Sequence, residues 1–162
     1  MKKSILAATT VAVASAAASG SIANPGGPGG WYSRLRKPPY QPPGAVFPIV
    51  WTTLYGDIAA TSAVAIERLR AAGRDDAARR YAIALCANLI INAGWSWVFF
   101  RYHKLGASAL GAAVLAVSTT DLVRRTAQAD PRAGLAMSPY AVWCIFATFL
   151  ATHVWRLNRD TE

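Results

Sequence analysis

Apolar residues occur along the chain in five runs, separated by short polar or proline-rich stretches. The runs cover about residues 5–23, 46–66, 80–100, 105–124 and 138–157. Each has roughly the 17 to 25 residues that a helix needs to cross a bilayer. Because lipid offers no partner to an unsatisfied backbone group, the runs predict helices. We therefore expect an all-α integral membrane protein, a five-transmembrane-helix bundle that forms a single domain over residues 1–162.

The first run allows a second interpretation. It follows Lys2 and Lys3, is rich in alanine and contains small residues, as a secretory signal peptide does. Ala12, Ala16 and Gly20 recur at four-residue spacing, which equally suits close packing of a retained helix. The residue pattern alone leaves both interpretations open.

Composition agrees with a membrane protein and excludes other classes. The chain is 54% hydrophobic and 15% charged, whereas a soluble domain has about 25% charged residues. The net charge of +9 could suggest a nucleic-acid partner, but the basic residues lie between the apolar runs and form no single patch. Contact with anionic lipid headgroups explains such positions, so we expect a lipid bilayer and no nucleic acid as partner.

Polar and aromatic residues recur at steps of three and four in three runs, which places each set on one helix face. The sets are Trp51, Tyr55, Ile58 and Ser62; Tyr81, Leu85, Asn88, Asn92, Trp95, Phe99 and Tyr102; and Tyr140, Trp143, Ala147, Leu150 and Val154. Two asparagines on one membrane-buried face are unfavourable without partners. We therefore expect the face with Asn88 and Asn92 to point into the bundle.

The tryptophans have two possible roles, in a headgroup-level aromatic belt or in a cavity lining. The belt is favoured for Trp31, Tyr32, Trp97 and Trp155. Trp51 and Trp143 share a face with small or polar residues, as a cavity lining would. Such a cavity suits a flat, apolar, aromatic ligand, and Arg34, Arg36 and Lys37 could meet carboxylates at its edge. A porphyrin with its propionates is one candidate among flat lipophilic molecules.

Three ionisable side chains within the runs could form an ion pair, contact a ligand or bind a metal. Asp121 lies within a turn of Arg124 and Arg125, which predicts an interfacial ion pair. Asp57 lies well inside its run and could bond a partner helix or meet a ligand. His153 could in principle ligate haem iron, but interfacial packing is the default for a single histidine.

Cys86 and Cys144 both fall inside apolar runs, with a spacing that indicates neither a metal site nor a disulfide. No acid–base or nucleophile constellation is visible, so hydrolysis and group transfer are not expected. We predict no metal site and no obligatory cofactor.

Three stretches carry a resemblance to a known family. They are WYSRLRKPPYQPPGAVFPIVWTTLY (31–55), LIINAGWSWVFF (89–100) and SPYAVWCIFATFLATHVWRLN (138–158). The chain closely resembles the translocator proteins, also called tryptophan-rich sensory proteins or peripheral-type benzodiazepine receptors, from about Ile5 to Asn158. The resemblance implies five transmembrane helices around one pocket, commonly in a homodimer, and a retained first helix. It also implies a proline-rich loop between helices 1 and 2 that covers the pocket.

The resemblance implies a function as well. Family members bind porphyrins and isoquinoline carboxamide or benzodiazepine-type drugs, which suggests a tetrapyrrole sensor, scavenger or transporter with protoporphyrin IX or haem as ligand. Light-dependent porphyrin degradation is an alternative, and a membrane interaction or scaffold protein is another. The implied location is a bacterial-type membrane, inner or outer.

Site residues are implied by motif or expected from the helix faces. Trp51 and Trp143 resemble the two pocket tryptophans connected with porphyrin breakdown, and would be catalytic only if degradation occurs. Pro42 and Pro43 match the lid. The full set of expected ligand-binding residues is Tyr32, Phe47, Val50, Trp51, Tyr55, Asn88, Asn92, Trp95, Phe99, Ala107, Leu110, Val114, Tyr140, Trp143, Ala147 and Leu150.

Two positions depart from the family pattern. Relatives commonly have Leu-Asn where this chain has Leu150-Ala151, so one polar ligand contact is missing. The cholesterol pattern needs a tyrosine shortly before Arg156, where this chain has Thr152 and His153. We therefore expect no cholesterol transport.

Overall fold

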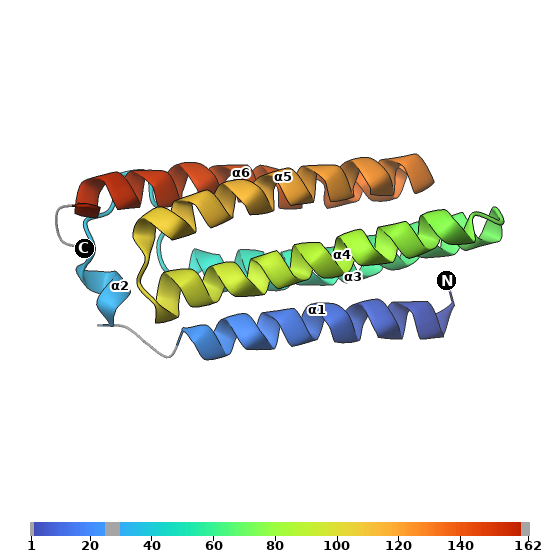
Figure 1. Cartoon of the computed structure of the whole chain (residues 1–162), viewed down its shortest axis with the longest axis horizontal. Helices are drawn as coiled ribbons and strands as arrows, with labels where there is room; N and C mark the ends of the chain where they lie inside the picture. The colour runs from blue at the N-terminus through green and yellow to red at the C-terminus, as the bar shows by residue number, and fades with distance from the viewer. Residues whose placement is uncertain (1, 25–29, 160–162) are drawn as a thin grey trace.

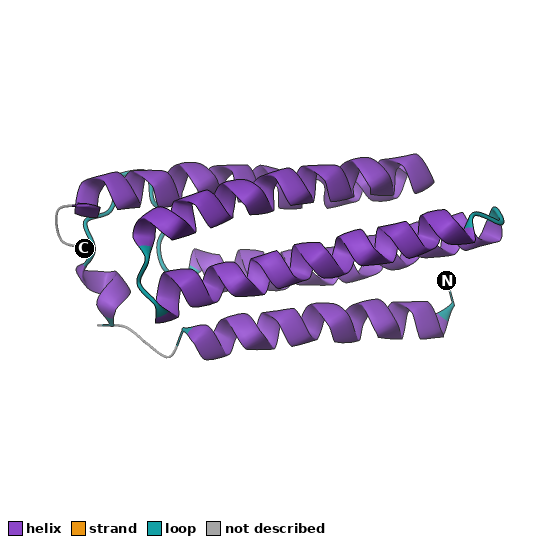
Figure 2. Ribbon diagram, viewed as in Figure 1, coloured by secondary structure: helices purple, strands orange, loops and turns teal. Residues whose placement is uncertain are grey.

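The computed structural model describes residues 2–24 and 30–159, and these residues are almost entirely helical (Figures 1 and 2). The elements are α1 (Lys3–Ala23), α2 (Trp31–Arg34), α3 (Val46–Ala71), α4 (Asp75–Ser96), the π-helical turn η1 (Trp97–Arg101), α5 (Leu105–Ala129) and α6 (Pro131–Asn158). Within the described ranges, five helices are long and apolar enough to cross a membrane, with η1 continuing α4. The predicted all-α membrane fold is thereby confirmed.

Four helices, α3 to α6, extend at least five residues beyond the predicted runs. α3 continues to Ala71 instead of ending near residue 66, and α4 begins at Asp75 instead of near residue 80. The added turns are polar, so a search for apolar runs misses them, although water at the membrane surface solvates them. Asp75 and Asp76 in the first turn of α4 also interact favourably with the helix dipole. The charged stretch between the two runs is therefore mostly helix.

The start of α6 differs most from the prediction. The helix begins at Pro131, seven residues before the expected start near residue 138, and Pro139 lies inside it. The Asp130 carboxylate accepts hydrogen bonds from the backbone N–H groups of Arg132 and Ala133, both at 3.0 Å. An aspartate N-cap followed by proline at the first helical position is a favourable helix start.

The five long helices pack side by side in a closed ring. Around the ring the order is α1, α3, α6, α5, α4, and α3 also contacts α4 and α5 across the centre. Figure 1 shows the N-terminus and the α3–α4 turn at one end of the bundle, with α2 and the C-terminal end of α6 at the other. The loop between α1 and α3 therefore covers the second end.

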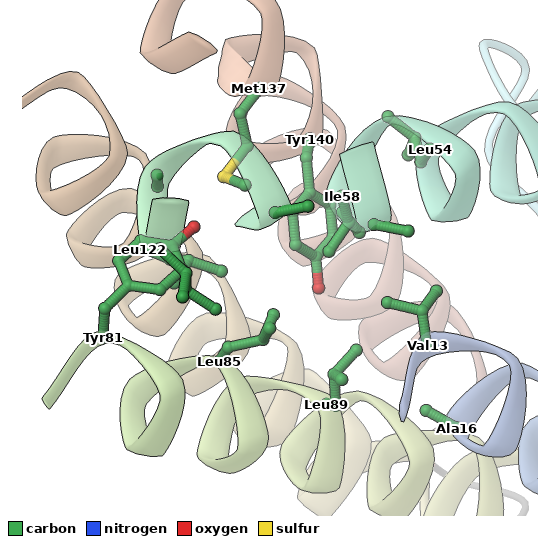
Figure 3. Packing of buried hydrophobic residues seen from close by; sticks show 14 of the residues in the cluster. Val13, Ala16, Leu54, Ile58, Tyr81, Leu85, Leu89, Leu122, Met137 and Tyr140 are labelled. Carbon is green, nitrogen blue, oxygen red and sulfur yellow. The ribbon is translucent and has the colours of Figure 1, made fainter. Parts of the chain in front are cut away.

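The core is formed by buried side chains from all five helices. Val13, Ile58, Leu85, Leu122 and Tyr140 represent α1, α3, α4, α5 and α6 in this cluster (Figure 3). α1 is joined to it by polar contacts also: the Thr9 hydroxyl donates to the Ala59 carbonyl at 2.9 Å, and Trp97 Nε1 donates to Ser19 Oγ at 3.0 Å. These contacts are those expected of a helix that belongs to the bundle.

Candidate functional site

A chain of hydrogen bonds links three helices in the middle of the bundle. The Tyr55 hydroxyl on α3 donates to Asn92 Oδ1 on α4 at 3.1 Å, and Asn92 Nδ2 donates to the Tyr140 hydroxyl on α6 at 3.3 Å. Tyr140 in turn donates to Asn88 Oδ1 at 2.8 Å. The two asparagines are 0% and 3% exposed, so the prediction that this face of α4 points into the bundle is confirmed.

The same series of hydrogen bonds continues to a fourth helix, α5. Asn88 Nδ2 donates to the hydroxyls of Ser118 and Thr119 on α5, at 3.1 and 3.0 Å. The Thr119 hydroxyl also approaches Cys144 Sγ at 3.7 Å. Sequence reasoning missed these α5 partners, although three consecutive hydroxyl residues at 118–120 within an apolar run were the available signal. Both asparagines thus have the partners that a membrane interior requires.

Aromatic rings from α3 and α6 lie directly beside this polar chain. The Trp51 ring packs against Tyr55 at a centroid distance of 5.4 Å and meets the Tyr140 ring edge-on at 6.3 Å. Phe47 meets Trp143 edge-on at 5.9 Å. Val50 and Ala147, also expected at the site, are half-buried in the same two helices. Trp51 and Trp143 therefore lie on two helices, α3 and α6, that pack against each other.

A second aromatic group lies under the loop. The Trp95 and Phe99 rings stack at 5.2 Å, and Tyr32 from α2 meets Phe99 edge-on at 5.6 Å. Leu150 and Phe47 belong to the same cluster. Burial raises the pKa of the Tyr32 hydroxyl above its usual value, so this group is a neutral hydrogen-bond donor at physiological pH. The expected residues thus form two adjoining groups, one central and one beneath the loop.

Hydrogen bonds hold the proline-rich loop against the end of α6. The Asn158 side chain bonds both backbone groups of Arg36, and the Tyr40 hydroxyl lies 3.0 Å from His153 Nδ1. Pro42 is half-buried and Pro43 exposed. His153 therefore packs at the loop, which agrees with its default interpretation.

Ala107, Leu110 and Val114 do not join the site. They lie on the outward face of α5, and Leu110 is 68% exposed. The inward face of α5 is formed by residues such as Ala112 and Thr119, which are at most 3% exposed. The expectation that these three residues line the pocket does not match this arrangement, because their helical phase places them away from Trp51 and Trp143.

Two hollows among the described residues lie elsewhere. One of about 110 Å³ lies between α4 and α5 at the end opposite the loop, and one of about 400 Å³ lies on the outer surface of α5 and α6. None of the expected ligand-binding residues lines either hollow. The rings of the expected pocket pack against one another instead, so a large ligand would have to separate them.

Charged groups divide between the ends of the bundle. Near the loop the described residues include no carboxylate, and the cations there are Arg34, Arg36, Lys37, Arg101, Lys104 and Arg156. At the other end Asp121 pairs with Arg124 and Arg125, at 2.8 and 2.5 Å, which confirms the predicted ion pair. Asp57 lies within α3, half-buried, and its Oδ2 atom has no hydrogen-bond partner among the described residues.

Comparisons with known proteins agree with this arrangement. The sequence model of the TspO/MBR family matches residues 7–156. The chain is 31% identical to "Protein CrtK" of Rhodobacter capsulatus over 159 residues, which cover 98% of this chain and 95% of that protein. It is 32% identical to "Tryptophan-rich sensory protein" of Cereibacter sphaeroides over 131 residues (81% and 78%). It is 28% identical to the human "Translocator protein" over 128 residues (79% and 75%).

Proposed function

The chain belongs to the TspO/MBR family, and from this premise we propose that it binds a tetrapyrrole, such as protoporphyrin IX or haem, within the membrane. The proposed role is that of a sensor, scavenger or transporter of this ligand. The observation that carries the proposal is the Trp51 ring beside the hydrogen-bonded Tyr55, Asn92 and Tyr140, with Trp143 on the adjoining helix α6.

Ring chemistry supports a flat aromatic ligand. The rings already form two edge-on pairs, Phe47 with Trp143 at 5.9 Å and Trp51 with Tyr140 at 6.3 Å between centroids. A porphyrin macrocycle can replace such contacts with stacked or edge-on contacts of the same kind. Its pyrrole N–H groups and ring nitrogens can exchange hydrogen bonds with the Tyr55–Asn92 pair. Isoquinoline carboxamide and benzodiazepine-type drugs combine flat rings with an amide, so they suit the same groups.

Charge at the loop supports a ligand that carries carboxylates. Protoporphyrin IX and haem each bear two propionates on one edge of the ring. With the ring between α3 and α6, the propionates extend toward the loop and its cations, among them Arg34 and Arg36. A guanidinium binds a carboxylate through two parallel hydrogen bonds. Among the described residues near the loop, no carboxylate forms an ion pair with Arg34 or Arg36.

Binding requires the site to open, because its rings are in mutual contact. The loop is joined to the bundle by few polar contacts, principally those to Asn158 and His153. Release of these contacts separates Tyr32 from Phe99 and uncovers the rings below. The loop therefore acts as a lid, and its prolines keep it extended when it is released.

The test is titration of purified protein with protoporphyrin IX, followed through the porphyrin absorption band. The variant Trp51→Phe/Trp143→Phe removes two indoles from the proposed site, and Trp97→Phe/Trp155→Phe removes two from elsewhere. We expect the first variant to bind roughly tenfold more weakly, since each aromatic contact contributes about 0.5–1.5 kcal/mol. If the two variants bind protoporphyrin IX equally well, Trp51 and Trp143 do not form the binding site.

Light-dependent porphyrin degradation is a second candidate. The paired indoles favour it, because tryptophan can donate an electron to an excited porphyrin held against it. Illumination of the complex should then consume porphyrin faster than illumination of the free pigment in the same detergent. If the two rates are equal, the degradation candidate is wrong. We also expect a homodimer, which crosslinking with and without porphyrin would reveal.

A further inference from the structure

A small hollow with three arginines lies at the end of the bundle opposite the lid. It has a volume of about 110 Å³ and lies between the start of α4 and the end of α5. Its lining consists of Leu69, Arg74, Ala77, Arg80, Tyr81, Arg125 and Gln128. None of these residues belongs to the proposed tetrapyrrole site, so the hollow requires an explanation of its own.

The α3–α4 turn sets the position of Arg74 on the rim. Gly73 has a positive φ of 68°, a conformation that suits glycine. The Arg74 N–H then donates to the Leu69 carbonyl at 2.9 Å, and the Arg74 carbonyl accepts from the Ala78 N–H at 3.0 Å. Arg80 lies three residues after Ala77, on the same side of α4. The rim backbone is therefore fixed by the turn and the first turns of α4, and the side chains of Arg74 and Arg80 are exposed.

The floor of the hollow is rigid and largely apolar. Leu69 is 6% and Tyr81 1% exposed. The Tyr81 hydroxyl donates to Ser62 Oγ at 3.1 Å and lies 2.8 Å from Thr126 Oγ1, so its polar end is already occupied inside the bundle. Polar recognition must come from the arginines and Gln128.

The arginines of the lining carry more positive charge than their neighbours neutralise. Two other arginines at this end are paired, Arg68 with Asp130 at 3.1 Å and Arg124 with Asp121 at 2.8 Å. Arg70 and Arg79 form no ion pair with a described residue and do not line the hollow. In the described part of the chain no carboxylate lies within ion-pair distance of Arg74 or Arg80.

Arg125 is paired, but only in part. It uses Nε for Asp121, and a guanidinium has five N–H donors, so further donors remain. Asp75 and Asp76 lie in the first turn of α4 near Arg74, but neither lines the hollow. The lining itself contains three cations and no anion.

We propose that this hollow binds the phosphate group of a membrane phospholipid or of a soluble phosphate compound. Guanidinium groups bind phosphate oxygens through paired, charge-assisted hydrogen bonds. Liquid water occupies about 30 Å³ per molecule, so the hollow accommodates a group of several heavy atoms. Its place at the ends of α3, α4 and α5 corresponds to headgroup level, where arginines interact with anionic lipids. The proposal is independent of tetrapyrrole binding at the other end.

A matched pair of variants tests the site. Arg74→Gln/Arg80→Gln removes two cations from the lining. Arg70→Gln/Arg79→Gln removes two exposed cations from the same end that do not line the hollow. Both variants lower the charge equally and keep residues with good helix propensity. A thermal unfolding scan in detergent verifies that both are folded before binding is measured.

The first arm uses nanodiscs of phosphatidylcholine with or without phosphatidylglycerol, and native mass spectrometry of the released protein. We expect the wild type and Arg70→Gln/Arg79→Gln to retain phosphatidylglycerol, and Arg74→Gln/Arg80→Gln to bind it roughly tenfold more weakly. An equal loss in both variants would assign the effect to the general charge of this end and overturn the site.

The second arm distinguishes the source of the phosphate. Glycerol 3-phosphate is titrated into protein held in phosphatidylcholine alone, by calorimetry. Binding that Arg74→Gln/Arg80→Gln abolishes supports a soluble phosphate ligand, and retention of phosphatidylglycerol alone supports a lipid. If the wild type binds neither probe, the proposal is wrong.

Discussion

The side-chain amide of Asn158 pairs with the backbone of Arg36, 122 residues earlier in the chain. Its Oδ1 accepts from the Arg36 N–H at 2.9 Å, and its Nδ2 donates to the Arg36 carbonyl at 2.9 Å. The pairing resembles one step of a β-ladder and satisfies both polar groups of a loop residue. It joins the lid to the last turn of α6, so the lid and the helix that carries Trp143 are mechanically connected.

Replacement of Asn158 by alanine should loosen the lid. It removes both bonds to Arg36, and each hydrogen bond contributes about 0.5–1.5 kcal/mol. We expect protoporphyrin to associate and dissociate several-fold faster, because the lid opens more often, with a smaller change in affinity. Stopped-flow tryptophan fluorescence measures both rates. Leu157→Ala, a truncation at the neighbouring half-exposed position, serves as the control; unchanged rates in Asn158→Ala would contradict a gating role.

Lid cations should matter only for ligands with free carboxylates. In Arg34→Gln/Arg36→Gln the backbone bonds to Asn158 remain, but two guanidinium groups are lost. We expect protoporphyrin IX to bind about twofold to tenfold more weakly, as for exposed ion pairs. Protoporphyrin dimethyl ester, which lacks the charges, should bind wild type and variant equally. A similar loss for acid and ester would show that the arginines act by shaping the lid.

The central hydrogen-bond chain should stabilise the bundle. Asn88→Ala leaves the Tyr140 hydroxyl and the α5 hydroxyls with fewer partners. We expect a loss of roughly 1–2 kcal/mol in the free energy of unfolding. Unfolding in mixed micelles with increasing sodium dodecyl sulfate measures it. Cys86→Ala, at an exposed position of the same helix, should have little effect. Equal losses in the two variants would mean that the hydrogen bonds of Asn88 do not stabilise the bundle.

Close packing of α5 and α6 should exclude a side chain at Gly134. A Cβ atom there would lie 2.4 Å from Ala127 Cβ and 2.5 Å from its Cα, so the backbones would have to separate. We expect Gly134→Ala to destabilise the protein by about 1–3 kcal/mol. Gly56→Ala provides the control, since no atom lies within 4 Å of its added Cβ. It should be neutral or slightly stabilising, because alanine favours the helix by up to about 1 kcal/mol.

The N-cap of α6 should make stability depend on pH at acidic values. Hydrogen bonds from the Ala133 backbone, assisted by the Arg68 charge, lower the pKa of Asp130 below its usual 3.8. A depressed pKa means that the stabilisation is complete above about pH 4 and disappears as pH falls through the folded value. We expect the melting temperature of the wild type to approach that of Asp130→Asn over this range. A constant difference down to about pH 2 would contradict it.

Helix number and the inward face of α4 could be predicted from the sequence, because both depend on local regularities. A run of about 20 apolar residues has one stable state in a bilayer. Asn88 and Asn92 lie one turn apart, and the high energy of an unpaired amide in lipid decides which way both point. The identity of their partners was not predictable, since Tyr140 and Ser118 come from other helices.

The start of α6 and the inward face of α5 could not be predicted from the apolar runs. α6 begins at Pro131 because Asp130 caps it, and a search for apolar runs alone does not consider caps. Ala107, Leu110 and Val114 lie in the mostly apolar first half of α5 (105–117), where residue type does not distinguish the inward from the outward face. Packing against α4 and α6 makes that choice.

The sequence by itself determined a five-helix membrane protein, the family, a stiff proline-rich loop and the positions of Trp51 and Trp143 on helix faces. These features follow from residue type, spacing and motif within single segments. Only the tertiary structure decided that Asn158 holds Arg36, that Asn88 reaches α5, and that three arginines share one hollow. Such pairings depend on which segments lie side by side, and the side chains meet only once the helices have packed in a definite order.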